Sequence, residues 1–197
     1  MCSREVPMAR LILAASLAML LAACSSLGGL APSSSGGPRS VDLVADDLAG
    51  LVFALDLPVN VEPAAAGPDF SYNVNDPTAP PFLATVLVRA DAELVMAAVP
   101  PPEAGRSYHV YVLPDAAREK MRALQAFARA LPRAPMPTVS IVPRLCLAGS
   151  VDRANTTHAV RVVLPGRGAL KPLIASETLA SLEARSSAIP ACPGHSG

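Results

Sequence analysis

Apolar and polar side chains alternate in several short stretches between residues 51 and 164, and proline, glycine, asparagine or aspartate separates one stretch from the next. A period of two predicts β-strands with one buried face. Alternation predicts strands over Leu51–Leu57 and Phe70–Asn75, and the aromatic and β-branched residues of Tyr108–Leu113 predict another. Further predicted strands are Phe82–Val88, Val139–Leu147 and Thr157–Leu164. Because Phe82–Val88 is apolar on both faces, we expect it to be a central strand. Leu94–Val99 fits either another strand or one helical turn.

One stretch has the period of a helix. Asp115 is expected to be its N-cap, and Pro132 ends it. Its predicted apolar face consists of Met121, Leu124, Ala128 and Leu131. A shorter helix is predicted to begin at Ser176, which would cap it.

The order of these elements favours a mainly β fold, an antiparallel sandwich of immunoglobulin-like size with the helix after Asp115 as an insert over one edge or end. The alternative is an α+β fold in which both helices pack on one face of a single antiparallel sheet. Residues 41–197 have the length of one globular domain.

The chain before residue 41 has a different pattern. A basic residue, Arg10, precedes an apolar run over Leu11–Leu21, and small residues and a cysteine follow, as in a secretion signal. The run is shorter than the roughly 20 apolar residues that a membrane-spanning helix needs. A plain secretory signal is a second alternative, but Leu21 is larger than its cleavage site prefers.

The four residues Leu21-Ala22-Ala23-Cys24 resemble the lipobox of bacterial lipoproteins. The resemblance implies that residues 1–23 are a signal peptide removed before Cys24. It also implies that the Cys24 sulfur carries a diacylglycerol and the new amino terminus a further acyl chain such as palmitate. Several acyl chains attach a protein stably to a membrane. Ser25 replaces the aspartate that favours the inner membrane, so the resemblance implies the outer membrane, with the protein facing the periplasm.

Residues 24–40 are predicted to form the lipidated cysteine and a flexible tether. Ser25–Ser40 is rich in serine, glycine and proline. A random coil of this length spans on the order of 20 Å. We therefore expect the folded domain to lie close to the membrane.

Composition excludes some partners. The chain has a formal net charge of zero and no basic stripe, so nucleic acid is not an expected partner. Tryptophan is absent and aromatic residues make up 4% of the chain, which argues against a carbohydrate-stacking platform.

The cysteines indicate a disulfide. Cys2 leaves with the signal peptide and Cys24 carries lipid, so Cys146 and Cys192 remain as a pair in an oxidising compartment. The alternatives are two separate thiols, or a zinc site that adds His195. The zinc site lacks a second pair of ligands, and we expect no metal and no other cofactor.

No catalytic residue is assigned from the sequence. None of the histidines has metal-ligand spacing, and the serine-nucleophile and phosphate-loop motifs are missing. An acidic group near the tether lacks the order of a calcium loop, and a glycosylation sequon is attributed to chance. The residues considered were His109, His158 and His195, the acids Asp42, Asp46 and Asp47, and the sequon Asn155-Thr156-Thr157.

These observations predict a membrane-anchored cell-envelope lipoprotein that acts as a non-catalytic binding or structural module, with membrane lipid and an envelope protein as partners. One alternative is a small-molecule or lipid carrier, or a transporter auxiliary subunit; a carrier requires an enclosed apolar cavity. The other is a hydrolase whose site is assembled from scattered residues. That alternative requires a histidine within reach of a serine and a carboxylate in a cleft.

Overall fold

The computed structural model describes residues 41–91, 101–133, 135–164 and 170–194. The predicted signal peptide and tether, Leu94–Val99 and His195 lie outside these residues. The described residues belong to one compact unit.

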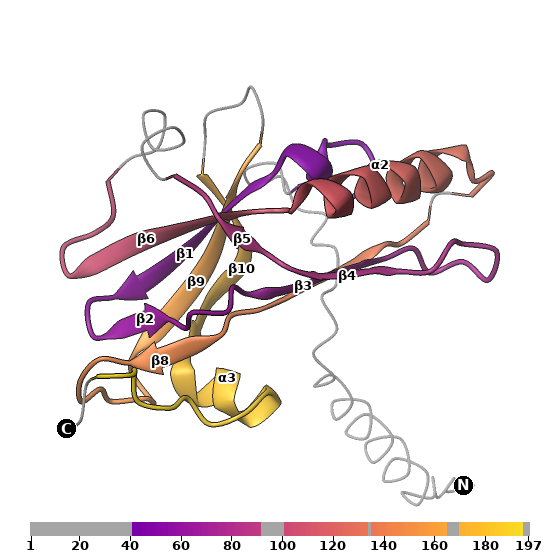
Figure 1. The fold of residues 1–197 in the computed structure, drawn as a ribbon. Helices are drawn as coiled ribbons and strands as arrows, with labels where there is room; N and C mark the ends of the chain where they lie inside the picture. Colours follow the sequence, from indigo (N-terminus) through magenta and orange to yellow (C-terminus); the bar gives the residue numbers. More distant parts are fainter. Residues whose placement is uncertain (1–40, 92–100, 134, 165–169, 195–197) are drawn as a thin grey trace, which may run out of the picture. The chain divides into compact units, whose positions relative to one another are not determined.

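Antiparallel strands are the main regular structure of this unit, which confirms the prediction of a mainly β sandwich (Figure 1). The largest sheet has the order β10 (Leu170–Thr178), β9 (Thr157–Val163), β1 (Val52–Pro58), β6 (Arg106–Val112) and β5 (Val88–Arg89). A second sheet has the order β4 (Leu83–Val86), β3 (Asp69–Asn73) and β7 (Thr138–Val142). A third pairs β2 (Val61–Pro63) with β8 (Leu145–Leu147).

The core lies between the five-stranded and three-stranded sheets. Alternation along β1 directs Phe53, Leu55 and Leu57 to one face, and each is at most 1% exposed. The ring of Phe53 packs against that of Phe70 on β3, with centroids 5.4 Å apart. Removing each such side chain from water stabilises the fold by roughly 1.5–3 kcal/mol. Because two sheets pack face to face, the single-sheet α+β alternative does not hold.

The predicted long helix is α2 (Asp115–Ala130), which packs against η2 (Leu48–Gly50) and β4 (Figure 1). Asp115 is not its N-cap. Pro114 occupies that position in an extended conformation, and Asp115 is the first helical residue, 3.2 Å from the Arg118 guanidinium. Among the described residues, no helix has both the length and the apolar character needed to cross a membrane.

The prediction that Phe82–Val88 is a central strand is wrong. The segment divides into β4 and β5, which are edge strands of different sheets. Leu83 and Leu87 are buried. The intervening positions 82, 84, 86 and 88 are exposed, so one of the two apolar faces seen in the sequence is a surface.

Two further boundaries differ from the prediction. Val139–Leu147 is not one strand, because it breaks after β7 and continues as β8 in another sheet. Ser176 does not cap the second helix but lies within β10. The cap of α3 (Leu179–Arg185) is Thr178, whose hydroxyl accepts a hydrogen bond from the Ser181 backbone at 3.2 Å.

Cys146 on β8 and Cys192 in the C-terminal tail form the disulfide that the sequence predicts. The tail also follows β8 through its backbone, since the Cys192 N–H donates to the Leu147 carbonyl at 2.8 Å. Both sulfur atoms are used by the bridge, so the alternative zinc site has no thiolates to offer.

Candidate functional site

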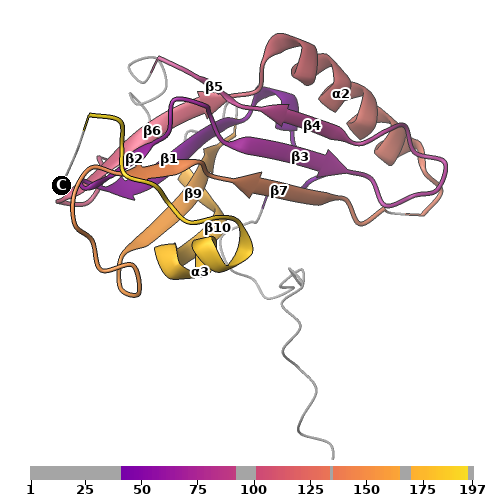
Figure 2. The same ribbon diagram turned by 60° about the horizontal axis from the view of Figure 1, so that its bottom comes forward.

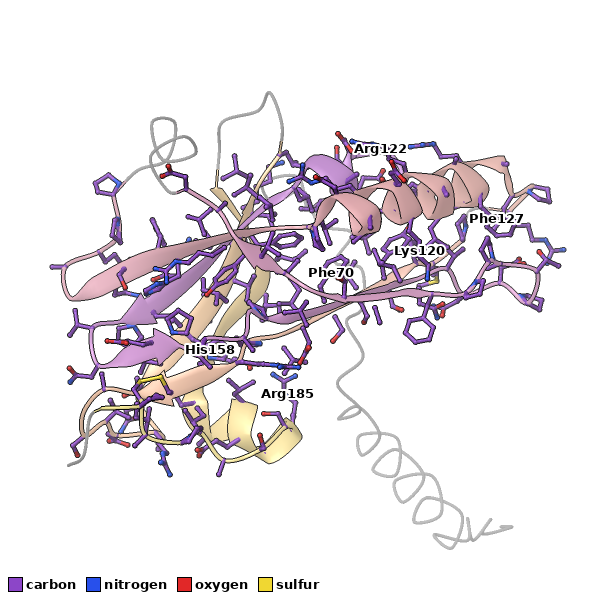
Figure 3. All side chains as sticks on the ribbon, in the orientation of Figure 1. Phe70, Lys120, Arg122, Phe127, His158 and Arg185 are labelled. Atoms are coloured by element: carbon purple, nitrogen blue, oxygen red, sulfur yellow. A yellow bond between two sulfur atoms is a disulfide. The ribbon has the colours of Figure 1, made fainter. Side chains whose placement is uncertain are left out.

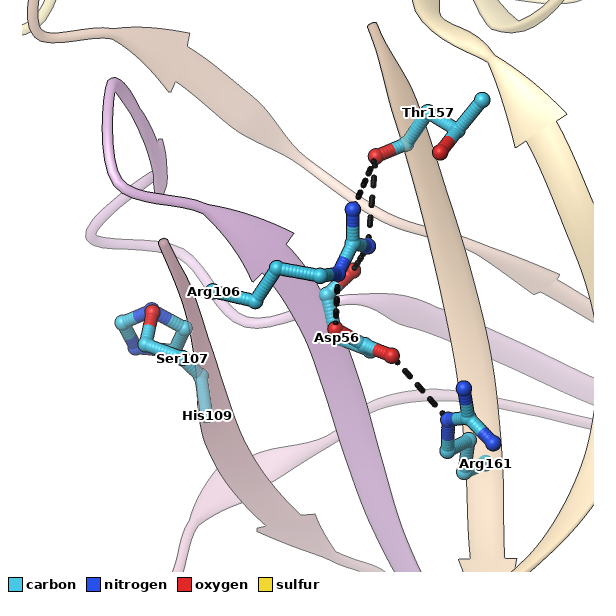
Figure 4. A network of polar contacts seen from close by, with 6 residues as sticks. All are labelled: Asp56, Arg106, Ser107, His109, Thr157 and Arg161. Carbon is cyan, nitrogen blue, oxygen red and sulfur yellow. Dashed lines mark hydrogen bonds and ion pairs between the residues drawn. The ribbon is translucent and has the colours of Figure 1, made fainter. Parts of the chain in front are cut away.

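The most extensive buried polar network centres on Asp56 of β1 (Figure 4). Asp56 alternates with Leu55 and Leu57, which places it on the face of the sheet opposite the core. One carboxylate oxygen accepts a hydrogen bond from Arg106 Nε at 2.5 Å, and the other accepts one from Arg161 Nε at 3.0 Å. The Asp56 side chain is 5% exposed.

Arg106 connects three neighbouring strands. From β6 it also donates to the Asp56 carbonyl of β1 at 2.8 Å and to the Thr157 carbonyl of β9 at 3.3 Å (Figure 4). Arginine stays protonated at ordinary pH, and both carboxylate oxygens face arginines. The network therefore links the three strands through charge-assisted hydrogen bonds.

His109 is the histidine closest to a catalytic arrangement. Its Nε2 lies 3.0 Å from the Ser107 hydroxyl on the same strand (Figure 4). Burial lowers the pKa of His109, the charge of Arg89 lowers it further, and that of Glu62 raises it. Its buried Nδ1 has no hydrogen-bond partner in the described part of the chain, so no carboxylate orients the ring. A serine is present, but the acid that a triad requires is not bonded to the histidine.

His158 on β9 is fully buried, with 0% of its side chain exposed. Its Nε2 lies 3.4 Å from a Glu177 carboxylate oxygen, and Glu177 also pairs with Arg185 of α3 (Figure 3). Neither ring nitrogen makes a hydrogen bond to the described residues. Burial lowers the pKa of His158; Glu177 opposes this effect, while Arg185 and Arg106 add to it. Burial inside the fold therefore disfavours the protonated ring.

Acidic conditions should destabilise the protein through His158. Its folded-state pKa lies below the unfolded value of about 6.5, so the unfolded chain binds more protons as the pH falls through this region. We expect the free energy of unfolding to decrease between pH 7.5 and 5.5, and His158→Gln to show a weaker decrease. Urea unfolding at both pH values measures this.

His109→Gln serves as a second variant, because burial lowers the pKa of His109 as well. The double variant should have the weakest pH dependence. If the free energy of unfolding of His158→Gln depended on pH as strongly as that of the wild type, His158 would not be the group that destabilises the protein in acid.

The other candidate residues have structural roles. Asp42 accepts hydrogen bonds from the backbone of Val44 and Ala45, and Asp47 accepts one from Gly50. Asp46 accepts from the Asp42 backbone at 2.8 Å. These acids close turns at the start of the domain, in agreement with the expectation of helix-start and loop charges.

A carboxylate also lies beside the disulfide. A Glu62 carboxylate oxygen and the sulfur atoms of Cys146 and Cys192 fall within 4.8 Å of one another. A sulfur in a disulfide cannot serve as the thiolate that a metal centre requires. In the sequon, the Asn155 amide donates to Asp152 at 2.7 Å within a turn.

The outer face of the three-stranded sheet differs from these buried groups, because it is an open surface that carries both apolar and polar side chains. Figure 2 looks onto this face, and no described helix or strand covers it. It contains a shallow hollow of about 360 Å³. The hollow is lined by Asp69, Phe70, Ser71, Ala84, Thr85, Val86, Ser140 and Val142. We call this surface the open sheet face.

A second hollow, of about 660 Å³, lies between the loop before β9 and α3. Arg153 and Glu183 approach to 3.6 Å at its margin. Both hollows are open to solvent, and neither is lined by Ser107, His109 or His158. Neither of these two hollows is an enclosed cavity that would support a carrier, and neither is a cleft around a histidine that would support a hydrolase.

No protein-family model matches the chain, and neither the curated proteins nor the solved structures contain a match. The functional inference therefore depends on the chain's own surfaces.

Neither the Asp56 network nor the open sheet face was predicted from the sequence. A lone acid within the apolar run Leu51–Leu57 was the available signal for the network. Its partners lie 50 and 105 residues away and depend on strand register.

Proposed function

We propose that this chain is a lipid-anchored protein of the cell envelope that acts as a non-catalytic binding module. Cys24 carries the lipid, Ser25–Ser40 is the tether, and the domain faces the periplasm from the outer membrane. A second envelope protein binds the open sheet face. The lipobox motif supports the anchor, and the surface chemistry of the sheet supports the binding role.

The exposed apolar side of β4 is the observation that carries this proposal. Val86 is 40% exposed, and Ala84 on the same face of the strand is also exposed. β4 is an edge strand of the three-stranded sheet, and α2 packs against it, so the outward-facing side chains rather than the strand edge are available to a partner. Exposed apolar side chains beside a hollow are typical of a protein-binding site. A partner would remove these side chains from water.

The rim of this surface supplies polar groups. Arg144 forms two hydrogen bonds with the Asp69 carboxylate, at 2.9 and 2.7 Å, and each side chain is 45% exposed. Protein interfaces ordinarily combine apolar with polar groups.

Site-specific photo-crosslinking in the native host tests the binding role. A photoreactive residue at Val86 should yield a discrete crosslinked product containing one envelope protein. The same residue at Val59, which is 64% exposed in the β1–β2 turn, should not. Val142→Asp, on the opposite side of the hollow, should weaken the Val86 product at least tenfold. Equal products at both positions, or none at Val86, would contradict the proposal.

A further inference from the structure

Two proline-rich connections lie side by side at one end of the domain. The β3–β4 connection and the α2–β7 connection extend together at the right of Figure 1. The Asn75 side chain of the first donates to the Met136 carbonyl of the second at 2.8 Å. We call Val74–Phe82 and Pro135–Pro137 together the loop end.

The loop end exposes two large apolar side chains. Phe82 is 56% exposed and Met136 is 67% exposed, the highest value among the large exposed hydrophobic residues of the described chain. Prolines accompany them at positions 77, 80, 81, 135 and 137. Proline restricts the backbone and has no N–H group that would need a partner away from water. Such loops can enter an apolar environment with little loss of backbone hydrogen bonding.

This end carries one acidic and one basic side chain. The Asp76 carboxylate accepts hydrogen bonds from the Thr78 backbone and hydroxyl, at 2.8 and 2.5 Å. Arg133, between α2 and Met136, is exposed. An arginine beside apolar side chains can keep its charge among lipid headgroups while its stem lies against the acyl region.

The tether joins the domain in the half that contains the loop end. The Val44 carbonyl accepts a hydrogen bond from Arg129 in the last turn of α2 at 3.3 Å. The Leu43 carbonyl accepts one from the Tyr72 hydroxyl at 3.0 Å. Tyr72 pairs with Leu83 of β4, the neighbour of Phe82. A 16-residue tether that spans on the order of 20 Å would hold this half of the domain near the bilayer.

We propose that the loop end docks on the lipid bilayer, with Phe82 and Met136 in its interfacial region, so that the anchored domain has one fixed orientation. The inference rests on the proposed lipid anchor. Acyl chains determine which surface holds the protein, whereas the loop end determines which side of the domain faces it. A fixed orientation presents the open sheet face consistently to a partner.

The absence of tryptophan makes a site-specific test possible. Three single-tryptophan variants, Phe82→Trp, Met136→Trp and the control Val59→Trp, are purified with their lipid and reconstituted in phosphatidylethanolamine–phosphatidylglycerol vesicles. Brominated acyl chains then quench tryptophans that reach the bilayer. We expect at least threefold stronger quenching at positions 82 and 136 than at position 59, which is equally exposed but lies in the β1–β2 turn.

The outcomes separate this inference from the proposed function. If the protein floats with vesicles but all three tryptophans are quenched equally, the docking proposal is overturned and the anchor stands. If position 82 is shielded only at high protein concentration or on addition of a protein partner, the loop end is a protein contact and the docking proposal also fails. If purified protein carries no lipid and does not float, the proposed function itself fails. A urea midpoint equal to that of the wild type verifies folding of each variant.

Discussion

Replacing Asp56 by asparagine should lower the free energy of unfolding by about 3–5 kcal/mol, the usual cost of removing one partner from a buried ion pair. The substitution removes a negative charge whose oxygens lie 2.5 Å from Arg106 Nε and 3.0 Å from Arg161 Nε. Two guanidinium groups would then face each other without compensation, and that of Arg106 is only 17% exposed. Urea unfolding monitored by circular dichroism measures the loss.

Asp69→Asn is the matched control. Asp69 also accepts two hydrogen bonds from an arginine, Arg144, but both side chains are 45% exposed. Water screens such a pair, so we expect a loss of about 0–1 kcal/mol. Equal losses for the two variants would show that burial does not determine the strength of the Asp56 network.

Replacing Cys24 by serine should abolish acylation entirely, because serine lacks the sulfur that the diacylglycerol transfer requires. Cells grown with a labelled fatty acid should incorporate label into the wild-type protein and none into Cys24→Ser. Ser26→Ala, two residues along the chain, should retain full incorporation. Label in the Cys24→Ser protein would place the acyl group elsewhere and would remove the basis for the tether.

The elements that could be predicted from the sequence are those whose own pattern determines them. β1 has alternating large apolar residues, β6 is rich in aromatic and β-branched residues, and α2 has a regular apolar face that buries Met121, Leu124 and Ala128. β2 has only three residues, and β10 contains Pro172 and two register irregularities. Their pairing partners stabilise these two strands, and a local pattern does not reveal those partners.

The error at Phe82–Val88 has a different cause. Alternation distinguishes two faces of a strand, but it does not indicate whether an apolar face contacts a core or solvent. Val86 and Val88 have the β-branched character of buried strand residues, yet they are exposed. The open sheet face therefore became visible only when the strand's position at the sheet edge was known. The partners of Asp56 could not be predicted for the same reason, since strand register alone brings Arg106 and Arg161 to it.

The lipid anchor, the tether and the envelope role all depend on how the mature chain begins. Intact-mass and peptide mass spectrometry of protein from its native host measures this directly. We predict a first residue at position 24 whose sulfur carries diacylglycerol and whose amino group carries a fatty acyl chain. A free thiol at that cysteine, or a chain that still begins at Met1 in the cytosol, would contradict it.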